Sequence, residues 1–320
     1  MADVPHLQWI AVDWGTTHMR AYAMANRDNG PDSEVLASAT GPGMREVAIA
    51  GGDFETSLLS AIDGWTIGPH IPVLLCGMVG SRQGWCEAGY LPIPQSLSDL
   101  ASHLVPVPAR NKALSAFILP GLKQTNPYDV MRGEETQLAG YLGTVSRQQT
   151  PSATERICLP GTHAKWVRMD SGIVTHFSTA LTGELFDMLS RHSILAHSLA
   201  GEGFDDEAFS DSVQTAYHDP ACVTEALFSI RAEGLLNGED GARARGRLSG
   251  LLIGAEFAGA HLEAGEAVTL IGAKALNTTY AKALSVLGHD ADNHDGEAMV
   301  LKGLSVVHGQ FKDRHATLVG

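Results

Sequence analysis

The sequence predicts an α/β protein made of two domains of related architecture. Two segments, 9–22 and 156–167, each read as a strand, a Gly-Thr turn and a second strand. Each segment opens a run of three strands that is followed by a helical pattern. The chain has 320 residues, which is enough for two hydrophobic cores. The two turns contain Gly15-Thr16-Thr17 and Gly161-Thr162.

Composition and charge exclude several classes of protein. The net charge of −14 argues against binding to nucleic acid or to an anionic membrane. No basic start precedes a long apolar segment, so no signal peptide is expected. Apolar runs such as 73–79 are too short to span a bilayer. The four cysteines have no metal-binding spacing, and a reduced, cytoplasmic protein is therefore expected.

The first half is expected to contain a domain spanning residues 1–148. Apolar alternation and helical spacing give the elements, and Gly/Pro-rich runs give the turns. Beyond the opening hairpin we expect strands at 34–39, 72–77 and 117–124 (the last interrupted at Pro120-Gly121), helices at 54–62, 98–103 and 133–142, and loops at 26–31 and 40–46. A polar linker at 143–155 is expected to end this domain.

The second half, residues 149–320, is expected to form a domain that opens in the same way. The helix at 242–262 carries a series of small residues, so another element is expected to pack closely on it. We expect strands at 173–179 and 268–272, and helices at 184–189, within 205–236, at 242–262, 274–287 and 297–311. The His- and Asp-rich run 289–296 fits no metal-binding pattern and is expected to be a solvated loop.

Asp13 and the first turn are candidates for holding a metal and phosphates. Asp13 ends an apolar strand, and Gly15 permits a sharp reversal. A carboxylate beside the N–H and hydroxyl groups of Thr16 and Thr17 suits hydrated Mg²⁺ next to a polyphosphate. An ordinary hairpin explains the segment equally well when it is taken alone. The second turn, at Gly161 and Thr162, favours the phosphate hypothesis.

No other nucleotide-binding motif is present in the sequence. It contains neither a Walker A motif nor a complete Gly-x-Gly-x-x-Gly fingerprint. The double hairpin is therefore the candidate ATP site, with the base near Gly272, although Gly272 also suits an ordinary strand-to-helix turn. Lys165 could neutralise phosphate charge or lie on a strand surface. His163, beside the second turn, is a candidate for substrate binding.

A kinase that phosphorylates a hydroxyl needs a base to accept its proton. Glu134 and Glu135 open the helix at 133–142, where carboxylates are also favoured by the helix dipole. We favour Glu135 as the base, because small residues one turn later allow that helix a close approach. Arg82 and Arg132, flanked by glycines, could bind a substrate carboxylate, although single arginines more commonly lie on the surface.

Five strings of residues resemble the 2-dehydro-3-deoxygalactonokinase family over nearly the whole chain. They are Val12–Ala21, Gly77–Trp85, Val130–Gln137, Leu159–Trp166 and Leu251–Glu256. The resemblance implies two ribonuclease-H-like domains of actin/hexokinase type around an ATP cleft. It also implies Mg-ATP-dependent phosphorylation of 2-dehydro-3-deoxy-D-galactonate on its 6-hydroxyl, in galactonate degradation. His18 stands where many relatives have Asn, and 288–296 is more charged than the terminal strand that this fold implies.

Two alternatives remain open at the level of the sequence. One is a kinase of the same fold that acts on another sugar or sugar acid, such as 2-dehydro-3-deoxygluconate. The other is a non-catalytic regulator that binds ATP or a sugar; a repressor would need a DNA-binding module, and only about eight residues precede the first strand, far fewer than such a module needs. The sequence leaves the oligomeric state open, a homodimer included.

Overall fold

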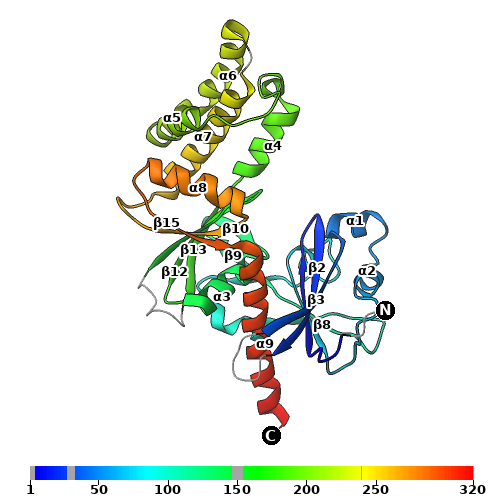
Figure 1. Ribbon diagram of the computed structural model, residues 1–320. Coiled ribbons are helices and arrows are strands. Elements are labelled where there is room, and N and C mark those ends of the chain that lie inside the picture. Colours follow the sequence, from blue (N-terminus) through cyan, green and yellow to red (C-terminus); the bar gives the residue numbers. More distant parts are fainter. Residues whose placement is uncertain (1–3, 27–32, 146–153, 239, 320) are drawn as a thin grey trace. The chain divides into compact units, whose positions relative to one another are not determined.

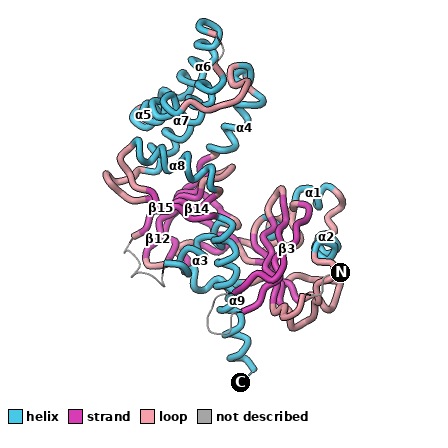
Figure 2. The backbone as a smooth tube through the Cα atoms, viewed as in Figure 1, coloured by secondary structure: helices cyan, strands magenta, loops and turns pink. Residues whose placement is uncertain are grey.

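The computed structural model describes residues 4–26, 33–145, 154–238 and 240–319, and Figures 1 and 2 trace the backbone. The chain separates into two compact units. Unit 1 comprises Met1–Thr154, Asp170–His176 and Gly296–Gly320, and unit 2 comprises Glu155–Met169 and Phe177–Asp295. The chain therefore passes from one unit to the other four times.

Unit 1 is built on a sheet with the strand order β3-β2-β1-β4-β8-β7. Its strands are β1 (Trp9–Trp14), β2 (His18–Asn26), β3 (Ser33–Pro42), β4 (Pro72–Cys76), β7 (Val105–Pro106) and β8 (Ser115–Ile118). β1 is antiparallel to β2 and parallel to β4, and β4 is parallel to β8. A smaller sheet has the order β10-β9-β5, formed by Tyr128–Met131, Gly121–Thr125 and Tyr90–Pro92.

The two faces of the large sheet are covered by different helices. Alternate residues of β1 point to opposite faces, so Ile10, Val12 and Trp14 join the core that includes Phe54 of α2. On the other face the ring of Trp9 stacks on His308 of α9, with ring centroids 4.3 Å apart. The helices of unit 1 are α1 (Met44–Ile49), α2 (Phe54–Ala61), α3 (Glu134–Val145) and α9 (Gly296–Val319), with short 3₁₀ turns η1 (Met78–Gly80) and η2 (Leu97–His103).

α9 packs closely on α3 because glycines face the contact. A Cβ atom built on Gly140 of α3 lies 2.0 Å from the carbonyl oxygen of Met299, and one on Gly303 of α9 lies 1.9 Å from that of Thr136. Figure 1 shows α9 as the red helix beside the strands of unit 1. The last helix of the chain is therefore an integral part of the first unit.

Unit 2 repeats the same sheet architecture. Its strand order is β15-β14-β11-β12, with β13 next to β12. The strands are β11 (Glu155–Leu159), β12 (Ala164–Asp170), β13 (Ile173–Ala180), β14 (Val268–Gly272) and β15 (Ala291–Asp295). β11 is antiparallel to β12 and parallel to β14, which is parallel to β15. Within unit 1, the first residues of β13 pair with β6 (Gln95–Ser96).

Both sheets have a strand order in which the first strand lies between the second and the fourth. This order, and the antiparallel second strand, confirm the expected ribonuclease-H-like fold in both units. The helices of unit 2 are α4 (Thr182–His192), α5 (Asp206–His218), α6 (Val223–Asn237), α7 (Gly241–Ala260) and α8 (Lys274–Val286), with η3 (Ile194–His197) and η4 (Pro220–Cys222).

The small residues of α7 pack against α5, as expected. Cβ atoms built on Gly246, Gly250 and Gly254 lie 2.3–2.4 Å from carbonyl oxygens of Asp205, Phe209 and Val213 respectively. The core between these helices and the sheet includes large aromatic side chains. By contrast, a Cβ atom on Gly259 meets no atom within 4 Å. Three of the glycines therefore serve the helix contact, and Gly259 does not.

Three sequence-based expectations about local structure are wrong. The run 289–296 is not a loop, because β15 pairs with β14 along Ala291–Asp295. Hydrogen bonding to a buried neighbouring strand outweighs the low strand propensity of Asp and Asn. The expected loop at 40–46 is mostly regular, since β3 ends at Pro42 and α1 begins at Met44. The interrupted strand at 117–124 divides between two sheets, as parts of β8 and β9.

The boundary expected at residues 148 and 149 lies outside the described residues, as does most of the expected turn at 26–31. α3 continues to Val145 and β11 begins at Glu155, so the expected linker at 143–155 is partly regular. The compact units differ from two consecutive halves in that 170–176 and 296–320 belong to unit 1.

Candidate active site

The first Gly-Thr turn joins β1 to β2 and is supported by the start of α1. The N–H of Gly15 donates to the carbonyl of His18 at 3.0 Å. The carbonyl oxygens of Gly15 and Thr16 accept from the N–H groups of Met44 and Arg45. Thr16 and Thr17 are exposed, so their hydroxyls are accessible to a ligand. The turn is held by its carbonyl groups, and its threonine side chains face solvent.

Asp13 lies at the carboxyl end of β1 in a partly buried ionic network. Its carboxylate is 3.5 Å from the guanidinium of Arg20, which is 3.7 Å from Glu297 at the start of α9. Tyr22 donates to Glu297 at 2.6 Å, and burial together with this carboxylate raises the pKa of Tyr22. Burial raises the pKa of Asp13, and Arg20 opposes that shift. Arg20 therefore forms ion pairs with two carboxylates of unit 1.

Gly77 and Gly133 allow the carboxyl end of β4 and the start of α3 to lie close together beside Asp13. Gly77 follows β4 with φ +88°, and a Cβ atom there lies 2.9 Å from the carbonyl oxygen of Trp14 and 3.6 Å from the Asp13 carboxylate. A Cβ atom on Gly133, before α3, lies 3.5 Å from the Cα atom of Gly77. Only glycine suits the left-handed backbone at these two positions. The start of α3 is thereby placed beside the carboxyl ends of β1 and β4.

Glu135 occupies the first turn of α3 and is completely buried. Both of its carboxylate oxygens accept from the N–H of Gly133, at 3.0 and 2.8 Å, and Thr136 donates its hydroxyl at 3.1 Å. Burial, reinforced by Glu134, raises the pKa of Glu135 to about 8. The negative charges of Asp13 and Glu135 both contribute to raising the pKa of the Cys76 thiol. Asp13 and Glu135 therefore share one electrostatic environment.

Glu134 and Arg132 flank the same turn. Glu134 is half-buried, and its carboxylate accepts from the backbone N–H of Arg132 at 2.8 Å. The Arg132 side chain is 8% exposed; it donates to the carbonyl of Gly89 at 2.7 Å and lies 4.4 Å from the ring centre of Tyr90. Among the described residues, its Nε and Nη1 atoms have no hydrogen-bond partner. Such orphaned buried donors are costly.

Arg82 has a different environment from Arg132. Its side chain is 83% exposed and lies 3.6 Å from Glu87. This is an exposed ion pair of the kind that contributes little to stability. The structure therefore places one of the two candidate arginines on the surface and buries the other.

The second Gly-Thr turn joins β11 to β12 and is supported by the start of α4. The carbonyl of Thr162 accepts from the N–H of Glu184 at 2.9 Å. A Cβ atom on Gly183 lies 2.4 Å from the carbonyl oxygen of Gly161, so the helix is too close to the turn for any residue other than glycine at this position. The first turn of a helix packs on the Gly-Thr turn in each unit.

A cavity of about 420 Å³ lies beside the second turn in unit 2. Its polar lining comes from Gly161, Thr162 and the N-terminal residues of α4, where backbone N–H groups favour an anion. Its apolar lining comes from α4, α7 and α8. The lining residues are Gly161, Thr162, Thr182, Gly183, Phe186, Asp187, Phe204, Ser249, Leu252, Ile253, Leu276, Thr279 and Tyr280. A pocket with polar and apolar ends of this size suits a nucleotide.

Glu256 is a buried carboxylate that links three elements around this cavity. It accepts from Trp166 Nε1 at 2.7 Å, from the hydroxyl of Tyr280 at 2.8 Å and from the hydroxyl of Thr182. Burial raises its pKa, and the three donors oppose that shift. Thr182 and Tyr280 line the cavity, and Glu256 therefore holds the hydroxyl groups of two cavity-lining residues in place.

The remaining candidates in unit 2 do not line this cavity. Gly272 ends β14, and a Cβ atom there lies 2.9 Å from the side chain of Asn277. Lys165 is buried in β12 rather than on a strand surface. His163 is exposed, with Nε2 at 2.5 Å from the Glu184 carboxylate.

Sequence reasoning missed Thr182, Tyr280, Glu256 and Glu297. The contact of Glu256 with Trp166 joins residues 90 positions apart, and a single sequence carries no signal for such a pair. Gly183 could have been found from the repeat, because Gly43 packs on the first turn as Gly183 packs on the second.

The chemistry of the donor groups suits Mg²⁺ and ATP. Among the described residues no three His, Cys, Asp or Glu side chains gather into a metal cluster. Magnesium needs no such cluster, because it is commonly bound by one or two carboxylates, waters and substrate phosphates. Asp13, which is partly exposed beside a Gly-Thr turn, fits that requirement. In the described part of the chain, no helix is long and apolar enough to cross a bilayer.

Each unit has the ribonuclease-H-like strand order, with a Gly-Thr turn between its first two strands, and this is the class of architecture that the sequence predicts. Residues 13–307 match the family model of 2-keto-3-deoxy-galactonokinase. A probable 2-dehydro-3-deoxygalactonokinase of Rhizobium meliloti (strain 1021) is 40% identical over 305 residues, covering 93% of this chain and 95% of its own length. The 2-dehydro-3-deoxygalactonokinase of Escherichia coli (strain K12) is 32% identical over 306 residues, covering 94% and 98%.

A crystal structure of a Sinorhizobium meliloti protein, provisionally given the same activity, has a TM-score of 0.82 at 40% identity. It covers 93% of this chain and 97% of that one. The chain belongs to the 2-keto-3-deoxy-galactonokinase family, whose members are sugar-acid kinases.

Proposed function

We propose that the protein transfers the γ-phosphate of Mg-ATP to the 6-hydroxyl of 2-dehydro-3-deoxy-D-galactonate, in the degradation of galactonate in the cytoplasm. Membership of the kinase family carries this proposal. It is supported by the environment of Arg132, Asp13 and Glu135 in unit 1 and by the cavity beside the second Gly-Thr turn in unit 2.

The nucleotide is proposed to bind in the cavity of unit 2. The phosphates would contact Gly161, Thr162 and the N-terminus of α4, because this end combines backbone N–H groups and hydroxyls. The adenosine would lie along the apolar side formed by residues such as Leu252 and Leu276. Lys165 and Gly272 remain proposed ATP contacts, although neither lines the cavity in this structure.

Asp13 is proposed to hold magnesium through its waters, and Thr16 and Thr17 to contact phosphate oxygens. When bound, the metal would neutralise phosphate charge during transfer. Arg20 limits the charge repulsion between Asp13 and Glu297, because it lies within 4 Å of both carboxylates. This arrangement keeps a carboxylate available at the end of β1.

Glu135 is proposed as the base that accepts the hydroxyl proton. Its raised pKa matches the requirement that a base be poised near neutral pH. Glu134 remains the alternative, because it is less buried and lies at the same helix start. Glu134→Gln and Glu135→Gln distinguish the two candidates. Replacement of the residue that acts as the base should lower kcat far more than substrate affinity. In wild type kcat should rise with pH toward about 8, and this rise should vanish only in the variant that lacks the base.

Arg132 is proposed to bind the substrate carboxylate, in preference to Arg82. The two unpartnered nitrogens of Arg132 would gain acceptors from a carboxylate, which removes the cost of leaving them unpaired. Arg82 already lies beside Glu87 and faces solvent. His163, which pairs with Glu184, remains a proposed contact to the substrate.

The decisive experiment incubates the purified protein with Mg-ATP and a panel of sugar acids. ADP release and the mass of the product are measured for 2-dehydro-3-deoxygalactonate, its gluconate-derived epimer and plain sugars. The proposal requires the highest kcat/KM for the galactonate derivative. Detection of ATP binding without sugar-stimulated ADP release would instead identify a regulator, and a higher kcat/KM for the epimer would change the substrate assigned.

A further inference from the structure

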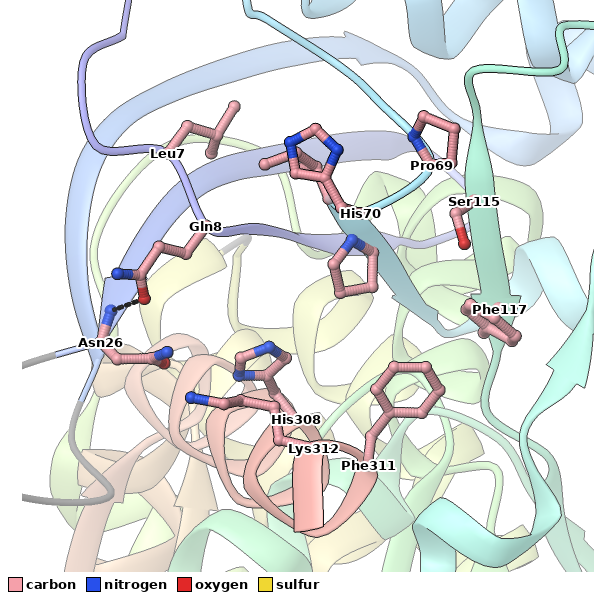
Figure 3. Close-up of a pocket in the computed structure, with 12 residues that line it drawn as sticks. Leu7, Gln8, Asn26, Pro69, His70, Ser115, Phe117, His308, Phe311 and Lys312 are labelled. Carbon is pink, nitrogen blue, oxygen red and sulfur yellow. Dashed lines mark hydrogen bonds between the residues drawn. The ribbon is translucent and has the colours of Figure 1, made fainter. Parts of the chain in front are cut away.

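A second cavity, of about 640 Å³, lies in unit 1 at the edge of the sheet opposite to Asp13. Its walls come from the residues that precede β1, from the end of β2, from residues at or just before the starts of β4 and β8, and from α9 (Figure 3). Because β1, β4 and β8 are parallel, their starting ends lie together, and their carboxyl ends lie at the other edge. About 13 Å of β1 separates Trp9 from Asp13, at ~3.3 Å per residue.

The cavity is polar and basic at one end and apolar at the other. In Figure 3, Gln8, Asn26 and Lys312 lie at one end, and Phe117 and Phe311 lie at the other. The two phenylalanine rings are in contact, with centroids 5.0 Å apart. No Asp or Glu is among the described lining residues, which include Lys312, His70 and His308. In a chain of net charge −14, this described lining carries one lysine and no carboxylate.

His308 connects the cavity to the core of unit 1. It lines the cavity although it is only 3% exposed, because its ring stacks on Trp9 at an interplanar angle of 10°. Burial and the nearby charge of Lys312 lower the pKa of His308 to about 4. At neutral pH the ring is therefore uncharged, and its nitrogen atoms can donate one hydrogen bond and accept another.

We propose that this cavity binds a small organic anion that has an apolar or aromatic body, at a site separate from the kinase centre. The carboxylate or phosphate of such a ligand would pair with Lys312 and hydrogen-bond to the amide of Asn26. Its apolar body would pack on Phe117 and Phe311. The volume falls in the range of sites for small molecules, about 300–1,000 Å³. A bare anion would contact only the polar end of the cavity, and a neutral hydrocarbon would contact only the apolar end.

The test uses three probes that separate these features. 2-Naphthoate carries an anion and an aromatic body, 2-naphthamide keeps the body without the charge, and inorganic phosphate keeps the charge without the body. Isothermal titration of the whole protein should show one site for 2-naphthoate, weaker binding of 2-naphthamide and no binding of phosphate at this site. Saturating Mg-ATP should leave naphthoate binding unchanged, because the nucleotide cavity lies in unit 2.

Three variants locate the site. Lys312→Gln should weaken naphthoate binding by up to about fivefold, the upper limit for a solvent-exposed charge pair. Ser115→Leu, which adds bulk to the lining, should abolish it, and Lys112→Gln, an exposed lysine outside the cavity, should have no effect. Unchanged kinase activity in Lys112→Gln and Lys312→Gln controls for folding.

A spectroscopic readout tests the position directly. Bound anion near His308 should offset the effect of Lys312 and raise the pKa of His308, measured by NMR titration, by about one unit. The proposal is overturned if naphthoate binds equally to wild type and Lys312→Gln, if 2-naphthamide binds as tightly as naphthoate, if ATP displaces naphthoate, or if the His308 resonance does not respond.

Discussion

At the scale of single residues, the carboxyl ends of β1 and β4 concentrate ionisable groups in a small volume. Asp13, Arg20 and Glu297 form one connected ionic network, and Glu135 lies buried at the start of α3. Burial raises the pKa of both Asp13 and Glu135. Groups whose pKa values are shifted by burial and by specific neighbours are typical of catalytic sites.

Asp13→Ala should abolish turnover and leave the fold intact. The carboxylate contributes little to the core, because its side chain is 24% exposed and its burial opposes ionisation. We expect kcat to fall at least a hundredfold, by the loss of metal positioning, while Tm changes by only a few degrees. Asp13→Asn is the isosteric control for shape. Activity near that of wild type in Asp13→Ala would exclude the metal role.

Glu135 should make the protein less stable as the pH rises. Its folded pKa of about 8 lies above its ordinary value of 4.5, so between these values the folded state binds the proton more tightly than the unfolded state. The free energy of unfolding should therefore decrease as the pH rises from about 4.5 to about 8. Urea denaturation of Glu135→Gln across this window should show a shallower decrease. Glu134→Gln, which removes one of the two causes of the raised pKa, should give a decrease between those of Glu135→Gln and wild type.

Single residues also mark the limit of what the sequence could predict. Asp13, Gly15 and Glu135 were found because local order places a carboxylate after a strand or at a helix start. Thr182, Glu256 and Tyr280 come together only through folding, since their hydrogen bonds join positions 24 and 74 apart in the chain. Burial decides between Arg82 and Arg132, and a single sequence does not reveal which of two arginines is buried.

At the scale of elements, glycines determine how closely helices approach their neighbours. α9 offers a direct comparison, because Gly303 faces the backbone of α3 and Gly309 meets no atom within 4 Å. Replacement of glycine by alanine at the two positions should therefore change the stability for different reasons. At Gly303 it disturbs packing, and at Gly309 it changes only helix propensity.

Gly303→Ala should destabilise the protein, and Gly309→Ala should stabilise it. A methyl group 1.9 Å from the Thr136 carbonyl oxygen forces α9 away from α3, which we expect to cost at least about 1–3 kcal/mol. Gly309→Ala should add up to about 1 kcal/mol through helix propensity. Thermal or chemical denaturation measures both, and equal signs for the two variants would contradict this account of the α3–α9 contact.

Gly183→Ala should weaken ATP binding without unfolding the protein. The added methyl group would lie 2.4 Å from the carbonyl oxygen of Gly161, so α4 and the second turn must separate. We expect the Kd for ATP, measured by calorimetry, to rise about tenfold or more, equivalent to ~1.4 kcal/mol. Gly259→Ala, which meets no atom within 4 Å, is the matched control and should bind ATP as wild type does.

Most elements follow from sequence periodicity, and the exceptions have physical reasons. Buried strands such as β4 and helices such as α2 and α8 lie close to their expected positions. β15 was missed because its residues, Ala-Asp-Asn-His-Asp, have no apolar alternation and are ordered by pairing with β14. α9 was expected as a helix, but its return to unit 1 depends on contacts with α3 that no local pattern reveals.

At the scale of the whole molecule, the two units are expected to divide the work of the kinase. The cavity proposed for ATP is formed entirely by unit 2, and the proposed metal ligand and base belong to unit 1. Binding and turnover should therefore be separable by mutation, one unit at a time.

A thermal-shift experiment with ATP tests this division. Asp13→Ala should keep the stabilisation that ATP without magnesium gives wild type, about 2.7 kcal/mol at a concentration of 100 Kd, although it has lost turnover. Gly183→Ala should lose about half of that stabilisation or more at the same concentration, because a tenfold higher Kd removes ~1.4 kcal/mol. If Asp13→Ala abolished the shift as well, nucleotide binding would depend on unit 1 and the division would fail.

The return of α9 to unit 1 determines the order in which the two units can be completed during synthesis. Residues 1–154 emerge first, but the surface of α3 that receives α9 stays uncovered until Gly296–Val319 has been synthesised. By then all of unit 2 has been synthesised. The unit encoded first is therefore completed last, and a nascent chain that stalls before residue 296 presents an unfinished N-terminal unit to chaperones.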